Sequence, residues 1–362
     1  MSDEQSVNES HSSLITHQSL LITDYSLKKM ETAIENKTIS GKANLEVFSS
    51  TLQELAAADR NIVVVTSDSR GSGKLVPFGQ KFPEQIVEIG IAEQNLVGVA
   101  AGLASAGKKV FAISPACFLT ARALEQIKND VAYSDNPVKL VGISAGVSYG
   151  ALGSTHHSLH DYAVLRAINN ITVVAPADNY ETAEAIKLAA AFDKPVYLRF
   201  GKKNMPDLDA VNQKTFQFGK GRIIREGNDI AFIATGETVY PALQAAKKLD
   251  EEYSIQATVV SMHTIKPLDY ELLGSTANNC KAIITVEEHS VHGGLGEACA
   301  SFLMQNRNPS VGGSRGGLFH IVGIPDEYTV TGSQNDIFNH YGISETGLAA
   351  TAMEMINKIK SA

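Results

Sequence analysis

The sequence predicts an α/β fold with two doubly wound domains in series. Two observations support this class. First, short apolar runs typical of buried parallel strands alternate with segments of helical periodicity between residues 44 and 200, and the alternation resumes at residue 230. Second, residues 204–218 between the two series contain Pro, Asp, Asn and Gln with little periodicity. Such alternation is typical of βαβ units, which build parallel sheets with helices on both faces.

This pattern divides the chain into four parts. Residues 1–40 are rich in Ser, Thr, Glu, Asn and Gln and are expected to form a polar, solvated extension. The first domain is predicted over residues 41–203, the linker over 204–218 and the second domain over 219–362.

The first domain begins with a predicted helix over residues 44–58, where Leu45, Phe48, Leu52 and Leu55 recur at helical spacing. Six apolar runs then have the length and composition of buried strands. They span residues 61–66, 85–89, 109–113, 138–144, 171–175 and 195–200. Helices are predicted for the run that follows Gly90 and for residues 119–132 and 181–192.

The second domain repeats this organisation with fewer clear signals. Strands are predicted over residues 230–234, 257–261 and 283–285, with a helix over 239–249. A Gly-rich turn follows at residues 292–296.

Composition excludes some classes of protein. The net charge of -8 argues against a nucleic-acid partner, whose phosphates attract basic surfaces. The three cysteines, Cys117, Cys280 and Cys299, are scattered without metal-ligand spacing and suggest reduced core residues in a cytoplasmic protein. No apolar run reaches the length of a membrane span, and no signal-peptide pattern opens the chain.

Glu93 is the first candidate site residue. It lies where a predicted strand turns into a helix, and its neighbours on both sides are uncharged. A carboxylate there needs a hydrogen-bonding partner, although an ordinary helix-start Glu would also be favoured by the helix dipole. Asp68 is a second candidate, because its loop follows a predicted strand at the sheet edge where α/β folds bind ligands; a helix cap is the alternative.

The loop over residues 145–160 is rich in Gly, Ser and His. His156, His157 and His160 could suggest a metal site, but only Asp161 lies nearby to support one. Histidines beside glycines on a polar loop are better suited to hydrogen bonding with a substrate, so no metal is predicted on this chain.

Five segments in order carry a resemblance to a known family. The run around Glu93, IGIAEQNLVGVAAGLASAG, resembles the pyrimidine-binding domain of transketolases and other thiamine-diphosphate enzymes. PACFLTARALEQIKNDVA resembles the aromatic-bearing segment that packs on the cofactor's pyrimidine, and GALGSTHHSLHDYAVLRAINNITVVAPAD resembles the Gly-x-Thr-His loop with the Pro-Ala-Asp that follows it. VVSMHTIKPLD and ITVEEHSVHGGLGEA resemble the transketolase C-terminal domain.

The resemblance implies a role for Glu93. Thiamine diphosphate becomes a nucleophile when its thiazolium carbon loses a proton, and a glutamate bound to the aminopyrimidine favours the tautomer that accepts it. Glu93 is implied as this catalytic and cofactor-binding residue, since its sequence neighbours are uncharged and no competing cation is expected beside it. Phe118 is implied to stack on the pyrimidine, with an ordinary core role as the alternative.

The resemblance also implies substrate contacts. His156 matches the histidine that contacts the oxygens of the sugar, and Lys202 lies where transketolases place a phosphate-binding Arg. A solvated linker Lys is the alternative for Lys202. Leu152 and Ser144 depart from the family, which usually carries an Asp and a His there, so the preferred sugar is expected to differ from xylulose 5-phosphate.

The family's amino-terminal domain has no counterpart here. That domain binds the diphosphate through a metal with a Gly-Asp-Gly motif, and no Gly-Asp-Gly occurs in this sequence. The resemblance therefore implies the C-terminal subunit of a split transketolase, with Mg²⁺ or Ca²⁺ held mainly by a second polypeptide. The small residues Gly98, Ala101 and Gly102 suggest close packing between two subunits, and a heterotetramer with a homodimer core is expected.

Three alternatives remain at this stage. A 1-deoxyxylulose-5-phosphate synthase would use the same cofactor, but it is normally one long chain. The β subunit of a 2-oxoacid dehydrogenase has a similar layout, but its motif lacks the Glu93-Gln94 pair. A non-catalytic subunit is disfavoured, because Glu93, Phe118 and His156 occur together.

Overall fold

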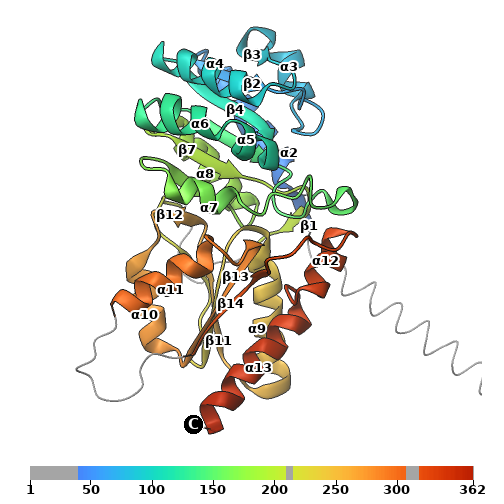
Figure 1. Cartoon of the computed structure of the whole chain (residues 1–362), viewed down its shortest axis with the longest axis vertical. Helices are drawn as coiled ribbons and strands as arrows, with labels where there is room; N and C mark the ends of the chain where they lie inside the picture. The colour runs from blue at the N-terminus through green and yellow to red at the C-terminus, as the bar shows by residue number, and fades with distance from the viewer. Residues whose placement is uncertain (1–39, 209–214, 307–317, 362) are drawn as a thin grey trace, which may run out of the picture. The chain divides into compact units, whose positions relative to one another are not determined.

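The computed structural model describes residues 40–208, 215–306 and 318–361 (Figure 1). The predicted polar extension, residues 1–40, lies outside the described residues except at its last position. Within the described segments, no helix combines the length and the apolar character that a bilayer crossing needs.

The first domain is built on a seven-stranded sheet with the order β12-β6-β7-β5-β4-β2-β3. All of its strands run parallel except the edge strand β12. The parallel strands are β2 (Ile62–Thr66), β3 (Ile86–Glu88), β4 (Lys109–Pro115), β5 (Lys139–Ile143), β6 (Thr172–Val174) and β7 (Val196–Arg199). Each corresponds to one of the six apolar runs, because residues buried on both faces of a parallel sheet are almost continuously apolar.

Helices cover both faces of this sheet (Figure 1). Successive residues of β2 show the division: Val64 belongs to the apolar cluster with Phe48 of α2 (Asn44–Ala58), whereas Val65 belongs to the cluster with Leu96 of α4 (Glu93–Ser105). The remaining helices of the domain are α3 (Val76–Lys81), α5 (Ala116–Arg122), α6 (Leu124–Gln126), α7 (Asp161–Ala167) and α8 (Asn179–Ala191).

One predicted helix is wrong as a continuous element. The run predicted as one helix over residues 119–132 begins earlier, at Ala116, and is divided into α5, α6 and a π-helical turn, Ile127–Tyr133. π-Helical turns are uncommon and often lie near functional sites. The break matters for function because it ends α5 at Arg122, whose side chain then faces Glu93.

The second domain is built on a five-stranded sheet with the order β14-β13-β10-β11-β9, in which only β9 is antiparallel. Its strands are β9 (Arg222–Arg225), β10 (Ile230–Ala234), β11 (Ala257–Ser261), β13 (Ala282–Ser290) and β14 (Leu318–Ile324). On one face, Phe232 packs with α9 (Val239–Tyr253) and α13 (Glu345–Ser361); on the other, Ile233 packs with α10 (Tyr270–Asn279) and α11 (Leu295–Gln305). α12 (Gln334–His340) precedes α13.

Two strands cross the simple division by sequence. β12 (Thr264–Lys266) follows β11 in the chain, yet it pairs with β6 and so completes the sheet of the first domain. β8 (Asn204–Pro206) lies within the predicted linker and pairs with β1 (Ser40–Ala43).

A buried polar cluster joins the two domains. Arg199, at the end of β7, donates hydrogen bonds to the Asp161 carboxylate at 2.8 Å and to the backbone oxygen of Glu288 at 2.8 Å. Gln334 donates from Nε2 to Glu237 at 2.6 Å and to Glu288 at 2.7 Å. We call these five residues the domain seam; their side-chain contacts hold the loop after β5 against the second domain.

Candidate active site

Glu93 opens α4, directly after the turn at Gly90, where φ is +80°. Its carboxylate is only 3% exposed. The first turn of a helix suits a carboxylate, because the free backbone N–H groups and the dipole favour negative charge there. The strand-to-helix junction predicted from sequence therefore places a shielded acid at the carboxyl edge of the sheet, where α/β folds bind ligands.

A cation lies beside Glu93. Arg122 Nη1 donates to both carboxylate oxygens, at 3.1 Å from Oε1 and 3.0 Å from Oε2. The expectation that no competing cation would be present is therefore wrong. The reason is tertiary: Arg122 is 29 residues further along the chain, and α5 brings it across the helix start.

Phe118 supplies an aromatic face next to this ion pair. Phe118 and Arg122 are four residues apart on α5, a spacing that puts both side chains on one helix face. The guanidinium carbon of Arg122 lies 4.3 Å from the centroid of the half-buried Phe118 ring. A planar group is thus held between an aromatic face and a buried carboxylate.

Two further predicted residues continue the same row of contacts. The His156 ring packs edge-on against Phe118, with 5.4 Å between ring centroids, and edge-on against Tyr149, also at 5.4 Å. Lys202 Nζ lies 4.8 Å from the centroid of the Tyr149 ring. The structure therefore brings Glu93, Phe118, His156 and Lys202 into one row, which we call the site row, through two residues that the sequence analysis missed, Arg122 and Tyr149.

The loop that carries His156 is fixed by the second domain. His157 Nδ1 lies 2.6 Å from Thr329 Oγ1, and His157 Nε2 lies 3.0 Å from the Gly150 carbonyl oxygen. Ser154 also contacts Thr329, at 3.1 Å. Burial lowers the pKa of His157, so this ring is a neutral structural anchor and His156 is left as the histidine that faces the site.

The three histidines of this loop do not converge on one point. His160 Nε2 contacts Thr120 at 3.2 Å, while His157 contacts Thr329 and His156 Nδ1 contacts Thr155 at 3.0 Å. Across residues 40–208, 215–306 and 318–361, no group of three or more His, Cys, Asp or Glu side chains is arranged to hold a metal ion.

Asp68 lies apart from the site row. Its backbone has φ +50°, and its N–H donates to Glu88 Oε1 at 2.6 Å. The same Glu88 carboxylate pairs with Arg70 at 3.2 Å. In the described part of the chain, no hydrogen bond joins the exposed Asp68 to the site row, so its cofactor role stays a prediction.

The two positions that depart from the transketolase pattern have different surroundings. Leu152 is 55% exposed at the rim of the His156 loop. Ser144 is fully buried, has φ +53° and lies in the sequence Gly-Ile-Ser-Ala-Gly, residues 142–146, which matches the pattern of a nucleophile elbow. Its hydroxyl has no hydrogen-bond partner among the described residues, so no histidine is placed to activate it.

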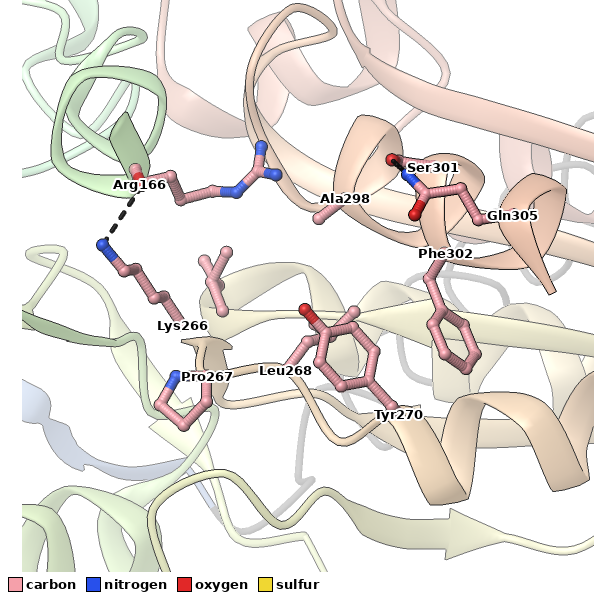
Figure 2. Close-up of a pocket in the computed structure, with 10 residues that line it drawn as sticks. Arg166, Lys266, Pro267, Leu268, Tyr270, Ala298, Ser301, Phe302 and Gln305 are labelled. Carbon is pink, nitrogen blue, oxygen red and sulfur yellow. Dashed lines mark hydrogen bonds between the residues drawn. The ribbon is translucent and has the colours of Figure 1, made fainter. Parts of the chain in front are cut away.

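A separate cavity of about 340 Å³ lies between α7, β12, α10 and α11 (Figure 2). Figure 2 shows Arg166 and Lys266 on one side and Tyr270 and Phe302 on the other. Both cations donate to backbone carbonyls: Arg166 to Gly294 at 2.7 Å and Lys266 to Arg166 at 3.2 Å. No member of the site row lines this cavity, so it plays no part in the chemistry considered below.

The site row fits the ring of an aminopyrimidine. Such a ring needs an aromatic face to stack on and a carboxylate that accepts a hydrogen bond from a ring nitrogen. Phe118 and Glu93 offer both, and Arg122 demonstrates that a flat group with N–H donors fits between them.

Comparisons with known proteins agree with this geometry. Residues 41–207 match the transketolase pyrimidine-binding domain family, and residues 219–348 match the transketolase C-terminal domain family. One of the two chains of an apulose-4-phosphate transketolase from Phocaeicola vulgatus is 48% identical over 311 residues, which cover 86% of this chain and 96% of that protein. This chain belongs to the transketolase family, and it corresponds to the C-terminal subunit of a split transketolase.

Two further comparisons refine the position within the transketolase family. The 1-deoxy-D-xylulose-5-phosphate synthase of Halothermothrix orenii is 34% identical over 86% of this chain, but the match spans only 48% of that protein. A solved structure described as a split gene transketolase, inactive beta4 tetramer, superposes with a TM-score of 0.75 at 35% identity and covers 88% of this chain and 99% of that one. The full-length counterpart of this chain is thus one chain of a split transketolase, with a transferase role and the thiamine-diphosphate chemistry of its family.

Proposed function

We propose that this chain is active only with an N-terminal partner subunit, and that the pair transfers a two-carbon ketol unit between sugar phosphates. The single observation that carries the proposal is the meeting of the buried Glu93 carboxylate and the Phe118 ring around one flat group. These residues suit the aminopyrimidine half of thiamine diphosphate, whereas this sequence contains no Gly-Asp-Gly for the diphosphate half.

Each residue of the site row has a distinct proposed role. When bound, thiamine diphosphate supplies the nucleophilic carbon that attacks the donor ketose. Glu93 accepts a hydrogen bond from the pyrimidine ring and so promotes the loss of the thiazolium proton. Phe118 positions the ring by stacking. His156, held by its loop at the end of the row, contacts the hydroxyl or carbonyl oxygens of the sugar.

Lys202 is proposed to bind the phosphate of the substrate. It is exposed, and its ammonium lies over Tyr149 without an ion pair among the described residues. A lysine attracts phosphate as a point charge, although it lacks the bidentate geometry of an arginine.

The partner subunit is proposed to hold Mg²⁺ or Ca²⁺ and the diphosphate through a Gly-Asp-Gly motif. On this chain, Gly98 and Gly102 leave an open face on α4, since a Cβ atom added at either would meet nothing within 4 Å. Ala101, which was predicted to share that face, is instead buried in the core. We propose that the Gly98 and Gly102 face lies at an interface between subunits of a heterotetramer with a homodimer core.

The substrate is proposed to be a phosphorylated ketose other than xylulose 5-phosphate. A relative that is 48% identical belongs to an apulose-4-phosphate transketolase, which makes that sugar phosphate the first candidate. The exposed Leu152 and the buried Ser144 leave fewer polar groups at the donor position than the family pattern would. We also retain the division of the chain at residues 203–204 and 218–219, and a cytoplasmic location, which the three buried free cysteines favour.

The test is co-expression with a partner chain that carries Gly-Asp-Gly, followed by a ketol-transfer assay with thiamine diphosphate and Mg²⁺. A panel of ketose phosphates, including apulose 4-phosphate, would serve as donors. We expect transfer only when both chains and the cofactor are present. Equal activity without the partner, or oxidative decarboxylation of a 2-oxoacid with a lipoyl acceptor in place of ketol transfer, would contradict the proposal.

A further inference from the structure

Arg122 is held only by the two groups that are proposed to bind the cofactor ring. Its guanidinium donates to both oxygens of Glu93 and lies 4.3 Å from the centroid of Phe118. Within the described segments, no other residue accepts a hydrogen bond from it. The side chain of Arg122 is 48% exposed, whereas that of Glu93 is 3% exposed, so the open side of the arginine faces solvent.

Two flat groups cannot share this position. A ring stacked on Phe118 within hydrogen-bonding distance of Glu93 must occupy the space that the guanidinium fills, because stacked aromatic and cationic partners lie about 4–6 Å from a ring centroid. The alternative for the ring, the other face of Phe118, is turned towards the body of α5 and away from Glu93, since Phe118 and Arg122 share one helix face.

We propose that Arg122 is a placeholder for the aminopyrimidine ring: it stacks on Phe118 and pairs with Glu93 in the free chain, and it leaves this position when the cofactor binds. The inference rests on the proposed function, because it takes Glu93 and Phe118 as the ring site.

The chemistry of arginine suits this task. A buried carboxylate without a partner is costly, so a free chain with an empty ring site would be destabilised around Glu93. The guanidinium is planar like the ring, carries N–H donors and stacks on aromatic faces, which a lysine ammonium does not do in the same way. Because the side chain is long and half exposed, it can move into solvent at little cost once the ring takes its place.

The proposal is tested by the binding of the ring alone to the full chain. The probe is 4-amino-5-hydroxymethyl-2-methylpyrimidine, which lacks the diphosphate and so does not need the metal site of the partner. Titration calorimetry compares the wild type with Arg122→Ala, Arg122→Lys and the control Arg60→Ala. Arg60 is a suitable control because it also pairs with one carboxylate, Glu84, but lies at the exposed surface.

We expect Arg122→Ala to bind the probe about tenfold more tightly than the wild type, because the ring no longer competes with the guanidinium. Arg122→Lys should fall between the two, and Arg60→Ala should match the wild type. The melting temperature of Arg122→Ala without probe should lie below that of the wild type, and saturating probe should raise it by more than it raises the wild type.

Unchanged or weaker binding by Arg122→Ala would overturn the placeholder, because it would mean that the arginine is indifferent to the ring or assists it. Failure of binding in all chains would overturn it as well. Proton exchange at the bound cofactor in the assembled enzyme separates the two proposals. If Glu93→Gln slows this exchange while Arg122→Ala fails to tighten binding, only the placeholder is wrong; if Glu93→Gln leaves exchange unchanged, the ring site itself is wrong and both proposals fall.

Discussion

Arg199 and Asp161 form a buried ion pair at the domain seam, with Arg199 Nε 2.8 Å from Asp161 Oδ2 and side chains that are 4% and 0% exposed. Burial alone would raise the pKa of Asp161, but Arg199 and His289 hold it below the ordinary value. Arg199 also donates to the backbone oxygens of Ser158 at 3.2 Å and Glu288 at 2.8 Å. One guanidinium therefore links the His156 loop to the second domain.

Replacing Arg199 by Met should destabilise the chain strongly. The substitution leaves Asp161 as a buried charge without its cation, and breaking such a pair costs about 3–5 kcal/mol. The midpoint of chemical denaturation should fall accordingly. The double variant Arg199→Met with Asp161→Asn should recover part of the loss, because no buried charge is then left unpaired. A single variant as stable as the wild type would show that the pair contributes nothing to folding.

The pH dependence of stability should carry a contribution from Glu288. Burial, and then the neighbouring Glu237, raise the pKa of Glu288 to about 8. A carboxyl whose folded pKa is raised stabilises the fold fully below its unfolded pKa, and this contribution is lost as the pH rises through the folded value. Wild-type stability should therefore fall relative to Glu288→Gln between pH 6 and 8, with a slope of at most about 1.4 kcal/mol per pH unit.

The Gln variant is a suitable reference because it keeps an oxygen that can accept from Val147 N–H and Gln334, as Glu288 Oε1 does at 3.0 and 2.7 Å. Comparison of the two proteins removes the opposite contributions of His289 and Lys139, whose pKa values burial lowers to about 4 and about 7. Parallel stability curves for the two proteins across this range would mean that Glu288 is ionised throughout.

The sequence predicts the fold and most of the site row because both depend on local patterns. Each strand of the first sheet that is parallel appears as an apolar run, and Glu93, Phe118 and His156 lie within segments that resemble one family. Arg122 could have been suspected from its spacing of four residues after Phe118, but nothing local indicates that it crosses to Glu93.

The features that the sequence misses all depend on long-range contacts. β12 joins the first sheet although it follows β11 of the second, and Thr329 holds His157 across 172 residues of chain. The π-helical turn after α6 leaves no mark in the apolar periodicity, so residues 119–132 look like one helix. Periodicity reports which face of an element is buried, but it does not report which distant element covers that face.

Lys202→Ala should weaken the recognition of substrate phosphate without changing that of unphosphorylated donors. Loss of one phosphate-binding cation should raise KM for a ketose phosphate by about tenfold, which corresponds to about 1.4 kcal/mol. Steady-state kinetics of the assembled enzyme with a phosphorylated and an unphosphorylated donor would measure the difference, and Lys202→Arg should restore it. The control is Lys187→Ala, since Lys187 pairs with Glu184 on the surface of α8. Equal changes for both donors would assign Lys202 to the loop structure instead.

Glu93→Gln should separate cofactor activation from substrate handling. Glutamine keeps the volume of the side chain but removes the charge that favours the reactive tautomer of the aminopyrimidine. Proton exchange at the thiazolium carbon, followed by NMR in the assembled enzyme, should slow by about a hundredfold, which corresponds to about 2.7 kcal/mol of barrier. Folding should change little, because a neutral amide is easier to bury than a carboxylate and Arg122 is free to turn into solvent.

His156→Ala is the matched variant from the other end of the site row. It should leave proton exchange near the wild-type rate and lower turnover with sugar donors, because its ring reaches the substrate side through Phe118 and does not touch Glu93. If Glu93→Gln exchanged and turned over like the wild type, Glu93 would be an ordinary helix-start residue paired with an arginine. The assignment of the first domain as the pyrimidine site would then fail, since no other carboxylate among the described residues lies beside the Arg122 and Phe118 pair.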